Sequence, residues 1–175
     1  SPERRLSKIN QVEEAVLKLS DLMEHLLLSA QAEEGVLILN AVKENLNSFC
    51  VRAVEQSVSV IEPGRTVYLD TTTEPIITNL DENLFANVMD NLLSNAFKFS
   101  HRDTQVTIRV KKLTARDIEI SVIDQGQGIK ADELAAVFLA FQRTSTRSTA
   151  GEHSTGLGLA ICKRIIEQSG GTIAV

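Results

Sequence analysis

The chain has few aromatic residues and no excess of positive charge. Aromatic side chains make up 4% of the 175 residues, tryptophan is absent, and the formal net charge is −5. Because nucleic-acid surfaces combine clustered Lys and Arg with aromatic platforms, this composition argues against a nucleic-acid partner. No apolar run approaches the roughly 18 residues of a membrane span, and residues 1–14 do not resemble a signal peptide. We expect a cytoplasmic segment without membrane contact, although its parent protein could still be membrane-anchored.

Cysteine is equally scarce. Cys50 and Cys162 each stand alone on an apolar helical stretch, which favours reduced packing residues over a disulfide or a metal site. The remaining composition, 43% hydrophobic and 23% charged, is ordinary for a globular chain. Its length allows one good core and an appendage.

What the chain does have is two pairs of closely spaced glycines. Glycine leaves backbone N–H groups bare enough to meet phosphate oxygens, and the second pair opens an apolar helical stretch whose N-terminus favours an anion. Either pair alone is more often a turn or a helix cap. Together they suggest a nucleotide site. The pairs are Gly126 with Gly128 and Gly156 with Gly158.

Residues 81–99 predict an amphipathic helix, with Asp81 as a suitable N-cap. Its polar face is rich in asparagine, which costs up to about 0.7 kcal/mol relative to alanine in a helix. A solvated face, the alternative, would favour Glu or Lys instead. Amide oxygens can ligate a hard cation beside a polyphosphate, so this face is a candidate site. The apolar face holds Leu84, Phe85, Val88, Met89, Leu92 and Ala96; the polar face holds Asn87, Asn91, Asn95 and Lys98.

Together these segments resemble the ATP-binding domain of sensor histidine kinases, in the superfamily that also contains DNA gyrase, a cytosolic chaperone and MutL. The motifs follow one another in the family's order, and the resemblance covers the chain from Gly35 to its end. It implies a Bergerat-type α/β fold, an α+β two-layer sandwich with a mixed sheet under helices, that binds ATP and Mg²⁺. The matching segments are 91–99 (N box), 124–129 (first glycine box), 138–143 (F box) and 155–161 (second glycine box).

The family's residue roles carry over to the matching positions. By resemblance Asp124 accepts the adenine amino proton, which selects adenine over guanine. Asn95 is the principal Mg²⁺ ligand with Asn91 beside it, and Lys98 reaches the phosphates. Phe99 covers the base where relatives often carry Tyr, so any hydrogen bond of that hydroxyl is lost here.

The resemblance also implies a lid and further nucleotide contacts. Residues 142–155 are polar and too long for an ordinary connection, which predicts the lid. Arg143 would meet the terminal phosphate, unless it is a solvated lid arginine. The further contacts implied are Gly126, Gly128, Ile129, Phe138, Gly156, Leu157 and Gly158.

One position predicts slow hydrolysis. In the water-hydrolysing relatives, a glutamate general base stands four residues before the Mg²⁺ asparagine. The residue here is Asn91, which cannot accept a proton at neutral pH. Holding ATP without hydrolysing it suits a kinase that serves another nucleophile.

Residues 3–30 carry a heptad pattern typical of a coiled-coil or helix-bundle seam. By resemblance, residues 1–34 are the second helix of a dimerisation and histidine-phosphotransfer bundle with a linker, and residues 35–175 are the catalytic domain. The parent would then be a homodimer. A generic amphipathic helix lying on the domain is the alternative. The seam consists of Ile9, Val12, Val16, Leu19, Met23, Leu26 and Ala30.

None of the three histidines, His25, His101 and His153, resembles the family's phosphoacceptor, which is followed by an acidic residue and then by proline. We expect the acceptor helix to precede Ser1 and a last hairpin to continue past Val175. The leading interpretation is a catalytic fragment that supplies Mg·ATP for transfer to that histidine and then to a response-regulator receiver domain. An ATP-sensing module and an anti-sigma-type Ser/Thr kinase are the alternatives, and the heptad helix argues against the latter.

The other elements follow from periodicity and turn residues. Leu46, Phe49 and Ala53 should face the core, and Gly170 and Gly171 should close the last helix. Strands are expected at 36–40, 66–70, 76–79, 105–110 and 118–123, with the last two forming a hairpin, and helices at 42–58, 131–138 and 157–169.

Overall fold

The computed structural model describes residues 38–60, 65–142 and 155–175, together with Lys8, Leu19 and Met23. The chain divides into two units, Ser1–Leu37 and Ile38–Val175, and almost all described residues lie in the second. In the first unit Leu19 and Met23 are helical and expose 59% and 64% of their surface. The other residues of the predicted seam lie outside the described part of the chain.

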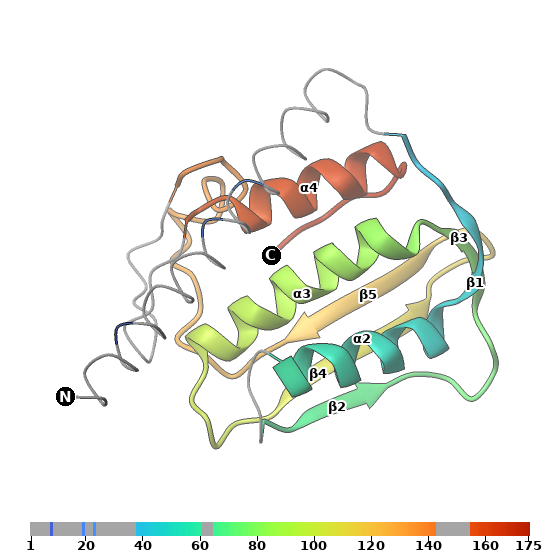
Figure 1. Cartoon of the computed structure of the whole chain (residues 1–175), viewed down its shortest axis with the longest axis horizontal. Helices are drawn as coiled ribbons and strands as arrows, with labels where there is room; N and C mark the ends of the chain where they lie inside the picture. The colour runs from blue at the N-terminus through green and yellow to red at the C-terminus, as the bar shows by residue number, and fades with distance from the viewer. Residues whose placement is uncertain (1–7, 9–18, 20–22, 24–37, 61–64, 143–154) are drawn as a thin grey trace. The chain divides into compact units, whose positions relative to one another are not determined.

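The second unit is an α/β domain with helices on one face of a mixed sheet. Strands β2, β4 and β5 form the larger sheet, in which β2 runs parallel and β5 antiparallel to β4, while β1 and β3 form a separate antiparallel pair. Helices α2 and α3 lie side by side over this larger sheet, and α4 lies beyond α3 (Figure 1). The elements are β1 (Val42–Asn45), α2 (Leu46–Val60), β2 (Val67–Asp70), β3 (Ile77–Leu80), α3 (Glu82–Phe99), β4 (Val106–Lys112), β5 (Ile118–Ile123) and α4 (Gly158–Gln168).

The main core lies between α2, α3 and the inner face of the sheet. Strand β4 alternates buried and more exposed residues, as expected for a sheet with one covered face. The predicted hairpin of β4 and β5 and the inward direction of Leu46, Phe49 and Ala53 are confirmed. The core residues that these elements contribute are Leu46, Phe49, Cys50, Ala53, Met89, Leu93, Ala96, Phe97, Val106, Ile108 and Val110.

Helix α3 packs on a second side against α4. The thiol of Cys162 in α4 lies 3.8 Å from the carbonyl oxygen of Val88 in α3, and Ile161 and Ile165 of α4 are buried. Because α3 is covered on two sides, it buries more residues than one apolar stripe provides. Leu93 and Phe97, which the helical pattern did not assign, are also buried, and both belong to the core on the sheet side.

Both cysteines are free and buried, as predicted. Burial raises the pKa of Cys50 to about 11. Burial also raises the pKa of Cys162 to about 12. Both thiols therefore stay protonated at neutral pH and act as small apolar packing groups.

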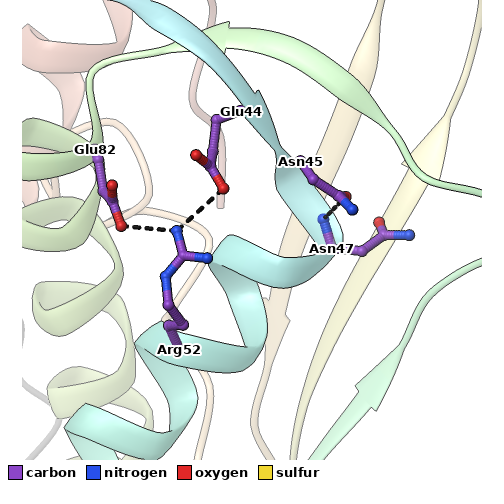
Figure 2. A network of polar contacts seen from close by, with 5 residues as sticks. All are labelled: Glu44, Asn45, Asn47, Arg52 and Glu82. Atoms are coloured by element: carbon purple, nitrogen blue, oxygen red, sulfur yellow. Dashed lines mark hydrogen bonds and ion pairs between the residues drawn. The ribbon is translucent and has the colours of Figure 1, made fainter.

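The predicted start of the helix at 42–58 is wrong, because a short strand occupies its first residues. Residues 42–45 form β1, and α2 begins only at Leu46, whose N–H donates to the Ile76 carbonyl at 2.9 Å. The Asn45 side chain accepts a hydrogen bond from the Asn47 N–H at 3.1 Å (Figure 2) and so acts as an N-cap. The strand predicted at 36–40 is wrong for its described residues, 38–40.

An arginine ties β1, α2 and α3 together. Arg52 of α2 donates to Glu82 at 2.7 Å and to Glu44 of β1 at 3.1 Å (Figure 2). The hydrogen bond to Glu82, followed by that to Glu44, raises the pKa of Arg52 above its ordinary value. Exposed ion pairs of this kind contribute little to stability, so the tie sets geometry more than it adds free energy.

The helix predicted at 131–138 is wrong, because this segment forms consecutive turns. Its backbone bonds join each third residue, with the N–H of Glu133, Ala136 and Leu139 donating to residues 130, 133 and 136. Only Val137 is buried there. A short segment without an apolar face to bury has little to stabilise an α-helix.

The end of α4 agrees with the prediction. Gly170 has φ of +80°, and the N–H of Gly171 donates to the Ile166 carbonyl at 2.9 Å, which is a glycine-dependent C-cap. Within the described residues, no helix combines the length and the apolar character that a membrane span requires.

Candidate nucleotide-binding site

The asparagine face of α3 is half-buried along its length. Asp81 accepts a hydrogen bond from the Leu84 N–H at 3.2 Å and fixes the start of the helix, as predicted. The polar residues that follow are neither core nor fully solvated, which distinguishes this face from an ordinary solvent-facing stripe. Those residues are Asn87, Asn91, Asn95 and Lys98.

The Asn91 side chain is oriented by the asparagine one turn before it. Its Nδ2 donates to the Asn87 carbonyl at 2.9 Å and to Asn87 Oδ1 at 3.0 Å. With the nitrogen engaged there, Asn91 Oδ1 points to the start of α4, where a β-carbon at Gly158 would lie 2.3 Å from it. The N box and the second glycine box therefore meet at this contact.

The first glycine box is attached to the C-terminal end of α3. Gly126 forms a β-bridge with Ser100, and a β-carbon at Gly126 would lie 2.4 Å from the Phe99 carbonyl oxygen. The Gly126 N–H donates to Asp124 Oδ1 at 2.7 Å, which fixes the carboxylate directly after β5. Asp124 is exposed, and Gly128 has φ of +71°.

The second glycine box closes the base of the predicted lid. Phe141 donates its N–H to the Gly156 carbonyl at 2.9 Å. Gly156 has φ of +72°, and a β-carbon there would lie 2.6 Å from the Gln142 carbonyl oxygen. The two described ends of the connection thus lie against each other. Residues 143–154, including Arg143, lie outside the described residues.

No side chain of the N-cap residue, Leu157, accepts a hydrogen bond from the first N–H groups of α4. Leu157 is buried, forms no side-chain hydrogen bond to the helix start, and donates its own N–H to Thr155 Oγ1 at 3.4 Å. The first N–H groups of a helix lack intrahelical partners and carry the positive end of the dipole. This end of α4 is therefore suited to an anion.

The F box lies beside α4. Lys163 Nζ stands 6.0 Å from the centroid of the Phe138 ring, a separation at the limit of a cation–π contact. Phe138 and Ile129 are half-buried, so both keep apolar surface that a flat ring could cover.

Two residues to which the sequence assigned no nucleotide or metal contact take part in the geometry of the site. Asn87 orients the Asn91 amide, and its place on the asparagine stripe was the available signal. Ser100 pairs with Gly126, and nothing in its sequence context distinguishes it from an ordinary helix-ending serine. The separate N-box, glycine-box and F-box segments are thus brought together around the ends of α3 and α4.

This geometry and a match to a family model define the class of protein. Residues 80–175 match the model described as "Histidine kinase-, DNA gyrase B-, and HSP90-like ATPase", and the chain belongs to this family. ATP binding is the property that the family membership implies.

The relatives narrow the class to sensor histidine kinases. The chain is 31% identical to the sensor protein KdpD of Clostridium acetobutylicum over 97% of its length, and 32% identical to the probable sensor histidine kinase TcrY of Mycobacterium tuberculosis over 99%. It is the histidine kinase type of catalytic domain. The chain spans only part of the length of these relatives, 19% of KdpD and 36% of TcrY.

A solved structure supports the fold. Full-length ShkA, crystallised in complex with AMPPNP, superposes with a TM-score of 0.76, at 23% sequence identity, over 90% of this chain and 32% of ShkA. The likeness establishes the α/β histidine kinase ATPase fold for the second unit.

Proposed function

We propose that this domain binds ATP together with Mg²⁺ and supplies the γ-phosphoryl group to a histidine outside this chain, from which it passes to a response-regulator receiver domain. The observation that carries the proposal is the contact of the Asn91 amide oxygen with Gly158. It brings a potential cation ligand to a helix N-terminus suited to phosphate.

The metal would be held by amide oxygens of α3. The Asn91 nitrogen is engaged by Asn87, so oxygen is the atom that Asn91 presents. Asn95, one turn further along the same face, is the proposed principal ligand. Mg²⁺ prefers oxygen ligands and is commonly completed by substrate phosphates and water, which fits a site with few protein ligands.

The adenine would be recognised at the first glycine box. An ionised carboxylate has several acceptor positions, so Asp124 can accept both the Gly126 N–H that it already binds and an adenine amino proton. Guanine presents a carbonyl oxygen at that edge. Both this oxygen and the Asp124 carboxylate are acceptors, so no hydrogen bond could form between them. Apolar surface for the ring would come from Phe99, Ile129 and Phe138, with Gly128 allowing close approach.

The phosphates would lie between the end of α3 and the start of α4. Lys98 would supply positive charge, and the backbone N–H groups from Gly156 to Gly158, including that of Leu157, would donate hydrogen bonds. Arg143 is proposed for the terminal phosphate. A β-carbon at either glycine would meet Gln142 or Asn91, which accounts for glycine at both positions.

The bound nucleotide is proposed to wait for a histidine instead of reacting with water. Asn91 cannot act as a general base at neutral pH, so no residue of the N box activates water. In phosphoryl transfer the protein contributes mainly positioning and charge stabilisation. Residues 1–34 are proposed to belong to the dimerisation and phosphotransfer bundle and residues 35–175 to the catalytic domain, in a homodimeric parent.

Transfer in trans tests the proposal. The chain is incubated with Mg²⁺, γ-labelled ATP and a separate acceptor-helix segment of the parent protein, and we expect acid-labile phosphohistidine on that segment only. The matched control is Asn95→Ala, which should transfer nothing. Label mapped to His25, His101 or His153 would contradict the proposal. Tight ATP binding without any transfer would favour an ATP-sensing module.

A further inference from the structure

A buried arginine from outside all the motifs lies at the C-terminal end of α3. Arg65, just before β2, exposes only 6% of its surface. Its Nη1 donates to the His101 carbonyl and its Nη2 to Ser100 Oγ, each at 2.5 Å. The guanidinium carbon lies 5.3 Å from the centroid of the Phe97 ring. The charge is therefore held between the helix end and the turn that follows it.

Stability alone is a weak reason to bury this charge. Burying a charged group costs free energy unless every polar atom is paired, and Arg65 Nε has no hydrogen-bond partner among the described residues. The gains are its two hydrogen bonds and its place at the negative end of the α3 dipole. The arrangement fixes how the chain leaves α3.

A continuous set of hydrogen bonds leads from Arg65 to the first glycine box. Ser100 donates its N–H and its hydroxyl to the Ala96 carbonyl, at 3.2 Å and 2.6 Å, so it is held to the last turn of α3. Ser100 also forms the β-bridge with Gly126, and Gly126 donates to Asp124. Displacing Ser100 would therefore displace the Asp124 carboxylate.

We propose that Arg65 is a positioning residue for adenine recognition. It acts through Ser100 and Gly126 to hold Asp124 in register with α3, whose asparagines would hold the metal beside the phosphates. This inference rests on the proposed function, in which Asp124 receives the adenine amino group. Arg65 itself does not touch the nucleotide.

The test compares nucleotide discrimination with stability in the full 175-residue chain. Competition calorimetry with Mg·ATP and Mg·GTP gives the affinity ratio. In Arg65→Gln we expect ATP to bind about tenfold more weakly, the effect of losing one well-placed hydrogen bond, with GTP affected much less. Arg65→Lys keeps the positive charge and an N–H donor group but not the forked geometry of the guanidinium, so it should retain part of the preference for ATP over GTP. Ser100→Ala should also lower the ratio of ATP affinity to GTP affinity.

Phe49→Leu is the matched control, because Phe49 is a core residue of α2 and takes no part in the hydrogen bonds that lead from Arg65 to Asp124. This variant should have a lower melting temperature and an unchanged ratio of ATP affinity to GTP affinity. The inference is overturned if Arg65→Gln and Ser100→Ala behave like Phe49→Leu. If the unmodified chain binds ATP and GTP equally, the role of Asp124 fails, and the inference fails with it. If Arg65→Gln does not fold, Ser100→Ala and Arg65→Lys decide the question alone.

Discussion

The two sides of α3 differ in what they contribute. The side facing the sheet carries Met89, Leu93 and Phe97, all buried among apolar groups. The other carries half-buried asparagines, one of which, Asn91, lies against Gly158 of α4. One helix therefore serves the core with one face and the candidate site with another, and the two contributions should be separable by mutation.

The difference lies in the kind of contact. Apolar packing is non-directional, and cores tolerate changes that keep volume and pattern. The site contacts are directional, because a hydrogen bond weakens when its geometry changes and a glycine contact leaves no room for a β-carbon. Core substitutions should therefore change stability much more than affinity, and site substitutions the reverse.

The largest effect is expected from Leu93→Ala. Leu93 has 0% exposed surface, and truncating a buried leucine costs about 2–5 kcal/mol of unfolding free energy. Denaturant unfolding measures the loss, and calorimetry at low temperature should give an ATP affinity within about twofold of the parent chain. A collapse of affinity in the folded variant would show that core and site are not separable.

Asp124→Asn should lower the ATP affinity and leave the stability nearly unchanged. Replacing the carboxylate by an amide removes a charge-assisted acceptor for the adenine amino group, worth about 2 kcal/mol of binding. Because Asp124 is exposed, the free energy of unfolding should change by less than about 0.5 kcal/mol. The measurement is the pair of ATP affinity and unfolding free energy. Unchanged ATP affinity would remove Asp124 from the site.

Gly158→Ala sharpens the comparison at the contact between the helices. The new β-carbon would lie 2.3 Å from Asn91 Oδ1, so the amide must rotate away. We expect ATP affinity to fall about tenfold, or about 1.4 kcal/mol. Alanine favours a helix over glycine by roughly 0.5–1 kcal/mol, so thermal stability should be nearly kept. Wild-type affinity in this variant would mean that the Asn91 orientation is irrelevant.

The smallest effect is expected in the pH dependence of stability, through the two buried cysteines. Burial raises the pKa of Cys50 to about 11 and that of Cys162 to about 12, from 9.0. Above pH 9 the unfolded chain loses these protons while the folded chain keeps them, so stability is lost as pH rises through the folded values. Chemical denaturation at increasing pH should show a shallower decline in the Cys50→Ala, Cys162→Ala double variant. Equal declines would contradict the assignment.

Sequence-based prediction succeeded for the elements whose local pattern and tertiary environment favour the same structure. The Asp81 cap, β5 and the glycine end of α4 follow from capping and alternation. The order of the motifs gave the family, which the comparisons confirm. The residue roles in the site stay predictions.

The failures come from contacts that no local pattern encodes. Residues 42–45 look helical by composition, yet pairing with β3 and the Asn45 cap make them a strand. The helix expected at 131–138 is lost because its residues have no core to cover. Arg65 is a single charge near a turn, and only the fold reveals that it is buried at the end of α3.

The asparagine face of α3 and the glycine boxes are proposed to bind ATP through Mg²⁺. Calorimetric titration of ATP into the folded chain, with Mg²⁺ and with a chelator, tests it most directly when run in parallel on Asn95→Ala. We predict that Mg²⁺ strengthens binding to the unmodified chain about 100-fold, or about 2.7 kcal/mol, and has little effect on Asn95→Ala. Full Mg²⁺ dependence in Asn95→Ala, or no ATP binding by a well-folded unmodified chain, would contradict the claim.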